Sequence, residues 1–201
     1  MTQRLAGTAR CVVLDAMGVI FESADDVAEL LIPFVRGSGG TGEVQTIRSA
    51  YVDASLGVLS ADEFWTAVGL DSTFEDEYLA MHALVPGALD FVRAAQNSGV
   101  AVWCLSNDVE RWSRKLRASF GIDRLLSGAV ISSEARARKP DIAIYRCLLD
   151  RCGYGAADIL FVDDRLANVG AALATGIPSI EFGPDVGYRH LAQRLFGTAL
   201  S

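Results

Sequence analysis

Short apolar runs alternate along the chain with segments whose apolar positions recur at helical spacing. The first run is Cys11–Leu14, which Asp15 follows at once. The other runs cover 100–105, 129–132, 159–162 and 179–182. Runs of this length, bounded by turn residues, are typical of buried strands. Because helical segments separate them, the sequence predicts an α/β fold with a doubly wound, mostly parallel, five-stranded sheet.

The interval 22–83 lacks the strand pattern and shows only helical periodicity. Its first helix is expected to end or kink at Pro33, because proline removes a backbone donor and clashes with the preceding turn. We therefore expect an α/β core formed by 1–21 and 84–201, with a helical insert at 22–83 between the first two strands.

Local capping signals within this insert mark two helix starts. Ser60 with Glu63, and Ser72 with Glu75, match the pattern in which a serine and a glutamate three residues later satisfy each other's backbone donors. Each pair is expected to open a helix at the serine.

Composition and charge narrow the functional class. The chain has 201 residues, a formal net charge of −7 and a pI near 4.8, which argues against a nucleic-acid partner. No apolar run is long enough to span a bilayer, and the N-terminus lacks the apolar core of a secretory signal, so we expect no membrane association and a cytoplasmic location. The basic residues of 109–120 are expected to form a solvated helix face.

Several isolated side chains carry no clear chemistry. The cysteines lack metal-ligand spacing and are expected to be reduced; they are Cys11, Cys104, Cys147 and Cys152. His82 and His190 are expected to be structural or exposed, and Trp65 and Tyr51 to be core residues of the insert. Glu134 is either a structural carboxylate or a neighbour of the site. Three arginines close to the polar motifs could hold a second anionic group of a ligand; they are Arg136, Arg138 and Arg165.

Polar residues follow three of the predicted strands. Asp15 follows the first, 106–108 (Ser-Asn-Asp) follow the second, and Asp163 and Asp164 end the fourth, while Lys139 precedes a helix. The carboxyl ends of parallel strands share one edge of a sheet, so these groups can converge. Paired carboxylates suit Mg²⁺, a hydroxyl with backbone N–H groups suits phosphate, and a lysine can neutralise the charge that they share.

These segments resemble the haloacid dehalogenase (HAD) superfamily of hydrolases. The matching stretches are VVLDAMGVIF, VWCLSND, RKPDIAIYRCLL and ILFVDDRLANVGAALATGI. The likeness covers essentially the whole chain, because the insert stands where the superfamily carries its small helical cap of the C1 type. The last two stretches look closest to the phosphatase domain of soluble epoxide hydrolases and to sugar-1-phosphate phosphatases.

The resemblance implies a Mg²⁺ site and its ligands. Asp15 matches the nucleophile, which also binds the metal, and Met17 matches the position that offers its backbone carbonyl. Asp164 matches the direct carboxylate ligand, Asp163 is expected to act through a bound water, and Asn168 to orient that shell.

It also implies a phosphate-binding group and a small phosphorylated substrate. Ser106 and Asn107 match the phosphate-binding motif, and Lys139 matches the motif lysine that assists Asp15. Gly18 is expected to allow the sharp turn toward the cap. A monomer or a homodimer is consistent with this assignment.

Met17 departs from the phosphatase pattern, which has a second Asp at this position as general acid and base. A thioether cannot transfer a proton, and general acid–base catalysis contributes typically ~10²–10⁴ in rate. The leading interpretation is a Mg²⁺-dependent phosphatase that acts through an aspartyl-phosphate on Asp15, on a substrate with a good leaving group or one that supplies its own proton.

Three alternatives stay open. A metal-independent 2-haloacid dehalogenase needs no acid, but such enzymes do not carry the Asp163-Asp164 pair. A phosphonate hydrolase uses a cap lysine, and 22–83 contains no lysine. The fourth interpretation is a catalytically weakened HAD-fold protein with a binding or regulatory role.

Overall fold

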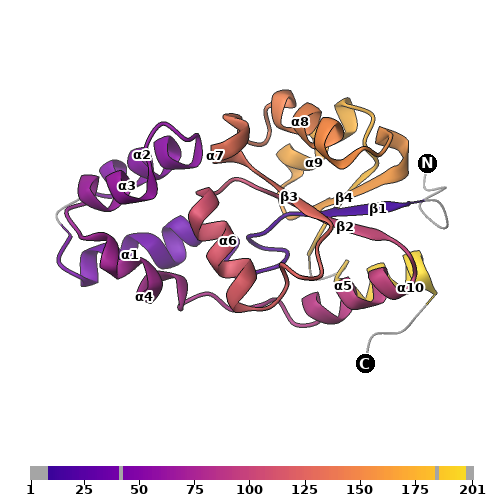
Figure 1. The fold of residues 1–201 in the computed structure, drawn as a ribbon, viewed down its shortest axis with the longest axis horizontal. Helices are drawn as coiled ribbons and strands as arrows, with labels where there is room; N and C mark the ends of the chain where they lie inside the picture. The colour runs from indigo at the N-terminus through magenta and orange to yellow at the C-terminus, as the bar shows by residue number, and fades with distance from the viewer. Residues whose placement is uncertain (1–8, 41–42, 184–185, 198–201) are drawn as a thin grey trace.

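The computed structural model describes residues 9–40, 43–183 and 186–197. Within them the sheet has five strands in the order β3-β2-β1-β4-β5, and every neighbouring pair is parallel (Figure 1). This confirms the predicted fold class. The strands are β1 (Cys11–Leu14), β2 (Ala101–Ser106), β3 (Gly128–Ile131), β4 (Ile159–Asp163) and β5 (Ser179–Glu181).

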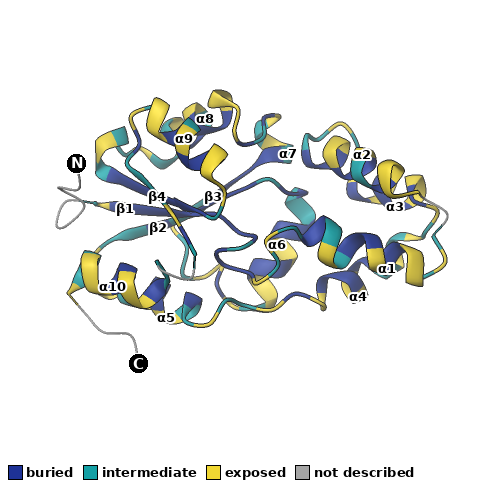
Figure 2. Cartoon of the chain, turned by 180° about the vertical axis from the view of Figure 1, so that it is seen from behind, coloured by how far each residue is buried: buried dark blue, intermediate teal, exposed yellow. Residues whose placement is uncertain are grey.

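Helices cover both faces of the sheet, as its continuous apolar strands require. Val12 and Leu14 pack on the side of α5 and α10, whereas Cys11 and Val13 pack on the side of α8 and α9. The central strand β1 is therefore buried on both faces (Figure 2). The core helices are α5 (Ala88–Asn97), α6 (Glu110–Ser119), α7 (Ser132–Ala135), α8 (Ile142–Cys152), η3 (Ala156–Asp158), α9 (Leu166–Ala174) and α10 (Tyr188–Phe196).

Between β1 and Leu84, the described residues form helices at the end of the molecule toward which β1 runs (Figure 1). The two segments that connect the sheet to these helices lie side by side. Val85 N donates to Ile20 O at 2.9 Å, and Glu22 N donates to Ala83 O at 3.0 Å. These helices are η1 (Val27–Leu31), α1 (Ile32–Gly37), α2 (Val44–Ser55), α3 (Ala61–Ala67), η2 (Ser72–Phe74) and α4 (Glu75–Leu79).

Two local expectations for this segment were wrong. Pro33 does not end its helix: it lies in the first turn of α1, where the π-helical turn η1 passes into an α-helix and a missing N–H is tolerated. The capping box at Ser60 and Glu63 is present, but Ser72 is not a cap. Asp71 accepts the hydrogen bond of Thr73 N at 2.9 Å instead.

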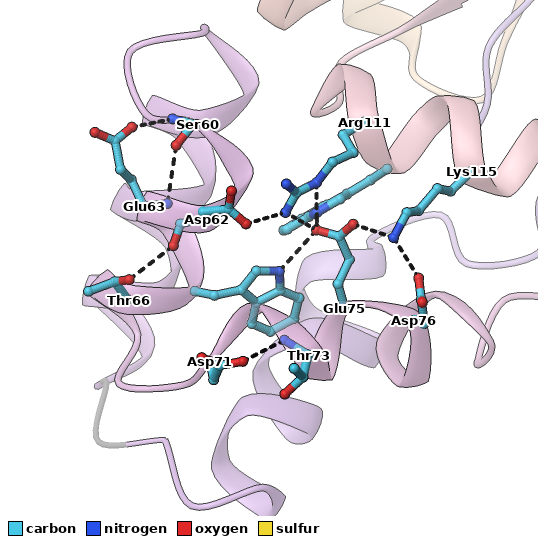
Figure 3. Close-up of polar contacts among 12 residues, drawn as sticks. Ser60, Asp62, Glu63, Thr66, Asp71, Thr73, Glu75, Asp76, Arg111 and Lys115 are labelled. Carbon is cyan, nitrogen blue, oxygen red and sulfur yellow. Dashed lines mark hydrogen bonds and ion pairs between the residues drawn. The ribbon is translucent and has the colours of Figure 1, made fainter.

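Glu75 does not form the second predicted capping box, because donor groups from other helices bind its carboxylate. Its side chain is only 2% exposed, and Oε2 accepts from Arg111 Nη2 at 2.6 Å and from Trp112 Nε1 at 2.7 Å, both on α6 (Figure 3). Oε1 lies 2.8 Å from Lys115 Nζ, and Trp65 Nε1 donates to Oε2 at 3.2 Å. The basic side of α6 is thus partly an interface with α4, not the solvated face that we expected.

Glu75→Ala is expected to lower the free energy of unfolding by about 3 kcal/mol, since it leaves several buried or half-buried donors without their acceptor. The estimate is at the low end for a broken buried pair because Arg111 and Lys115 reach solvent. Urea denaturation measures the effect. Glu77→Ala, an exposed change on the same helix, is the matched control and should shift stability by less than about 0.5 kcal/mol. Equal losses in the two variants would contradict the assignment.

The contribution of Glu75 to the free energy of unfolding should also depend on pH. Burial raises the pKa of Glu75, but hydrogen bonds from Arg111, Lys115, Trp112 and Trp65 outweigh it, so the net pKa lies below its ordinary value. A depressed carboxyl pKa adds stability above the unfolded-state pKa, and this stability is lost as the pH falls through the folded-state pKa. The difference between the parent and Glu75→Ala should therefore shrink in acid.

The remaining isolated residues behave largely as expected. All four cysteines are free, and Cys11 and Cys104 are buried. His82 is buried with Nδ1 3.1 Å from Leu79 O, and His190 is exposed. No helix among the described residues is long and apolar enough to cross a membrane.

Candidate active site

Asp15, Lys139 and Asp163 meet at the carboxyl edge of the sheet. Asp15 directly follows β1, Asp163 ends the neighbouring strand β4, and Lys139 lies in the loop between α7 and α8. Lys139 Nζ lies 2.5 Å from Asp15 Oδ1 and 2.8 Å from Asp163 Oδ2, and it donates to Leu105 O at 2.8 Å. The parallel register predicted this convergence, because adjacent strands deliver their last residues to one edge.

Burial and ion pairing shift the pKa values of Asp15, Asp163 and Lys139 in different directions. Burial raises the pKa of Asp15 to about 8, against the opposing pull of Lys139. Burial likewise acts on Asp163, but Lys139 and further hydrogen bonds hold its pKa below the ordinary value. Desolvation would lower the pKa of Lys139, yet the two carboxylates raise it. The Lys139 ammonium is therefore shared by the side chains of Asp15 and Asp163.

Asp163 and Asp164 are adjacent in sequence but differ in their partners. Asp163 Oδ1 accepts from Arg165 N and from Asn168 Nδ2, each at 2.9 Å, while Oδ2 binds Lys139. By contrast, Asp164 Oδ1 is buried and lacks a hydrogen-bond partner. The sequence indicated different roles for the two carboxylates only through the family resemblance, and the structure supplies a geometric reason.

The donor set fits a hard divalent cation. Carboxylate oxygens of Asp15, Asp163 and Asp164 lie within 4.8 Å of one another, and carboxylates are the ligands that Mg²⁺ prefers. The orphaned Asp164 oxygen is accounted for if a cation binds there. Within the described part of the chain, the Met17 carbonyl accepts no hydrogen bond, so it too is available as a ligand.

Residue 18 must be a glycine because the Asp164 side chain lies directly against its backbone. Its φ is +77°, and a Cβ at this position would lie 2.5 Å from Asp164 Oδ2. The sequence suggested a glycine turn, but only the structure shows which side chain approaches it.

Gly18→Ala is expected to weaken Mg²⁺ binding by at least about tenfold, because Asp164 must move and the left-handed backbone becomes strained. Isothermal titration of Mg²⁺ measures the change. Gly153→Ala is the control: it also has a positive φ, +71°, but no atom lies near the added Cβ. If both variants bind Mg²⁺ as the parent does, the approach of Gly18 to Asp164 does not control the site.

The Asn107 side chain has a positioning role that the sequence did not indicate. Its side chain accepts from Lys139 N at 2.7 Å and donates to Lys139 O at 2.9 Å, so it fixes the backbone of the lysine. Ser106 is 1% exposed and lines the cavity described next. Asp108, from the same polar cluster, is buried and accepts from Val109 N at 2.7 Å.

A cavity of about 220 Å³ opens beside these groups. Asp15, Met17, Lys139 and Asn168 contribute to its lining from the sheet side. From the helical segment and the neighbouring loops, the lining includes Asp25, Asp26, Arg48, Tyr51, Arg138 and Arg165.

The arginines predicted for a second anion are only partly at the cavity. Arg138 lines it, and Nη1 of Arg138 is buried without a hydrogen-bond partner, with the guanidinium 5.5 Å from the Tyr51 ring centroid. Arg165 lines it and donates to Ala24 O at 2.7 Å. Arg136 is not among the lining residues, and Glu134 pairs with Arg151 at 3.2 Å, away from the site.

Sequence reasoning missed Asp26 and Arg48 as lining residues and favoured a core position for Tyr51 over one that faces the substrate. Tyr51 is 5% exposed, but its hydroxyl donates to Asn107 O at 2.8 Å and its ring borders the cavity. Asp25 accepts a hydrogen bond from Ala28 N at 3.1 Å, and Asp26 stands at the cap position before η1.

The fold, and the charged cavity at the carboxyl edge of its sheet, are those of an α/β enzyme of the hydrolase type. The chain belongs to the haloacid dehalogenase-like hydrolase family, whose sequence profile matches residues 9–176. This confirms the family resemblance drawn from the motifs.

Similar curated proteins are phosphatases. A phosphoglycolate phosphatase of Pseudomonas fluorescens is 27% identical over 197 residues, covering 90% of this chain and 71% of that protein. One of Rhodospirillum rubrum is 29% identical over 160 residues, covering 78% of this chain and 66% of that protein. These relatives are longer than the part that the chain matches, and they favour phosphatase chemistry within the family.

Solved structures share the fold. A HAD family enzyme from Bacteroides thetaiotaomicron, in complex with magnesium and inorganic phosphate, superposes with a TM-score of 0.77 at 16% identity, covering 91% of this chain and 98% of that one. The L-2-haloacid dehalogenase of Xanthobacter autotrophicus superposes with a TM-score of 0.62 at 21% identity, covering 92% and 81%. At these identities the likeness concerns the fold alone.

Proposed function

We propose that the protein is a Mg²⁺-dependent phosphatase of small phosphorylated metabolites, with Asp15 as nucleophile. The observation that carries the proposal is the meeting of Asp15, Asp163 and Asp164 with one buried lysine beside a small cavity. Three carboxylates and one ammonium leave excess negative charge, which a divalent cation would balance before a phosphate enters.

In this reaction, Asp15 attacks phosphorus in line with the leaving oxygen and forms an aspartyl-phosphate, which water then hydrolyses. Lys139 stabilises negative charge that spreads over the phosphoryl oxygens, while Asn107 holds its backbone in place. The Ser106 hydroxyl and the neighbouring backbone N–H groups hold the phosphate.

Mg²⁺, when bound, would supply charge neutralisation at the phosphoryl group. Asp15, Asp164 and the Met17 carbonyl would hold it directly, and Asp163 through water. Asp163 suits an indirect role because both of its oxygens already accept hydrogen bonds, and Asn168 keeps it oriented.

The segment 22–83 acts in this proposal as a C1-type cap over the core formed by 1–21 and 84–201. Cap and core touch beside the cavity through Tyr51, whose hydroxyl binds Asn107 O, and through Ser132 Oγ, which donates to Ser55 O at 2.5 Å. Such a cap excludes bulk water and selects the substrate. A cytoplasmic location and a monomeric or homodimeric state remain predictions.

The cationic lining favours a substrate with a second acidic group. The free Nη1 of Arg138 would donate to a carboxylate, and the cavity has room only for a small molecule. Phosphoglycolate, named in the relatives, has this chemistry and is the first substrate to test.

A single pair of assays tests the proposal against the dehalogenase alternative. Phosphate release from a panel of phosphorylated metabolites is measured with Mg²⁺ and with EDTA, beside chloride release from 2-chloropropionate. We expect Mg²⁺-dependent phosphate release and no chloride release. Metal-independent chloride release would identify a dehalogenase, and binding of Mg²⁺ and phosphate without turnover would favour a binding protein.

A further inference from the structure

The proposed reaction requires a proton donor that Met17 cannot be. The leaving oxygen of an alkyl phosphate must be protonated, and the attacking water must lose a proton. Met17 borders the cavity, and its thioether can do neither. The missing group must reach the leaving oxygen inside this cavity, so it is sought among the carboxyl groups that the helical segment contributes to the lining.

Asp26 is the buried carboxylate of that segment at the cavity. It is 6% exposed, lines the same cavity as Asp15 and Met17, and stands immediately before η1. Although it occupies a cap position, its side chain makes no capping hydrogen bond. Oδ2 lies 3.3 Å from the Tyr78 hydroxyl, which holds the carboxyl group in place. A buried carboxyl group that is held in place by a neutral hydroxyl and borders the ligand space is available for chemistry.

We infer that Asp26 is the general acid and base of this site, in the role that Met17 leaves vacant. The inference rests on the proposed phosphatase function and identifies a residue of that same site.

The surroundings of Asp26 suit both protonation states near neutral pH. Burial raises its pKa to about 6, and Asp25 adds to the rise, while the hydrogen bond from Tyr78 and the charge of Arg165 oppose it. The other titratable groups that interact with it are Asp108, Tyr51 and Tyr78. A general acid and base works best when its pKa lies near the working pH.

The two half-reactions balance with one proton carried by Asp26. In the first, a bond forms between Asp15 and phosphorus, the bond to the leaving oxygen breaks, and that oxygen takes the proton of the Asp26 carboxyl group. In the second, the Asp26 carboxylate takes a proton from water, whose oxygen bonds to phosphorus as the bond to Asp15 breaks. Phosphate leaves and Asp26 is again protonated.

Asp26→Asn separates the two half-reactions. Steady-state phosphate release should fall by ~10²–10⁴ for phosphoglycolate and for acetyl phosphate, because the second half-reaction lacks its base. Only acetyl phosphate, whose leaving acetate needs no proton, should still phosphorylate Asp15. Intact-mass spectrometry of the quenched protein should therefore detect a phosphoenzyme with acetyl phosphate and not with phosphoglycolate.

Asp53→Asn is the matched control. It removes the same charge from an exposed residue of the helical segment that does not line the cavity. It should turn over both substrates within about threefold of the parent and accumulate no phosphoenzyme.

Two further variants keep the test independent of misfolding. Met17→Asp in the Asp26→Asn background should restore phosphoglycolate turnover at least about tenfold, since it returns a carboxylate beside the nucleophile. Tyr78→Phe removes a hydrogen bond that lowers the pKa of Asp26, so the acidic limb of the kcat profile should move to higher pH.

The outcomes separate this inference from the proposed function. If the parent is active while Asp26→Asn turns over both substrates like the parent, or loses phosphorylation by both alike, Asp26 is not the proton-transfer group. A parent that releases no phosphate and forms no phosphoenzyme overturns the phosphatase proposal, and the role of Asp26 falls with it.

Discussion

Asp15→Asn is expected to reduce phosphate release by roughly 10⁴-fold or more, to the limit of detection, because an amide cannot form the phosphorylated intermediate. The change is nearly isosteric. The amide oxygen still accepts from Ala16 N, which lies 2.6 Å from Oδ1 in the parent, and from Lys139. The fold should therefore persist. Phosphate release and mass spectrometry of the quenched protein measure the two effects.

The controls for Asp15→Asn address stability and binding. Thermal unfolding and circular dichroism should remain close to those of the parent. Inorganic phosphate should still bind, since Ser106, Asn107 and Lys139 are unchanged. Residual turnover above about one hundredth of the parent's, with a phosphoenzyme on another residue, would contradict the role of Asp15.

Lys139→Met is expected to cost both activity and stability. Lys139 is 1% exposed in its side chain and balances two carboxylates, so its loss leaves Asp15 and Asp163 facing each other in a buried site. Removing one member of a buried ion pair costs about 3–5 kcal/mol. Phosphate release should fall by roughly 10²–10³, as for loss of a preorganised donor to the transition state.

The response of Lys139→Met to Mg²⁺ distinguishes repulsion between Asp15 and Asp163 from a simple loss of packing. A divalent cation near the carboxylates should relieve their repulsion, so Mg²⁺ should stabilise Lys139→Met in urea denaturation more than it stabilises the parent. Arg114→Met is the control, because it removes a cation whose side chain is 62% exposed. A Lys139→Met protein as stable as Arg114→Met, with or without Mg²⁺, would contradict the shared-cation arrangement.

Patterns within a few residues determined most of the fold. Each strand lies within one residue of its predicted start and end, and Ser60 and Glu63 form the predicted capping box. These features depend on local propensity, burial periodicity and capping, which a single sequence carries.

Local patterns failed where distant groups compete for the same side chain. Ser72 and Glu75 have the spacing of a capping box, but donors from α6 and from Trp65 bind Glu75 more strongly than the Ser72 backbone could. Likewise, the local spacing gave no sign that the Asn107 side chain fixes the backbone of Lys139. A partner more than thirty residues away leaves no signal in the local spacing.

By itself, the sequence determined the order of strands and helices and the residue types at the strand ends. Strand ends in a parallel sheet must share one edge, so Asp15 and Asp163 were predictable neighbours. Only the tertiary structure decided that Asp164 lacks a partner, that Gly18 makes room for it, and that Asp26 borders the cavity. The physical reason is that hydrogen-bond competition and burial depend on contacts between residues far apart in the chain, and these exist only once the helical segment packs over the sheet.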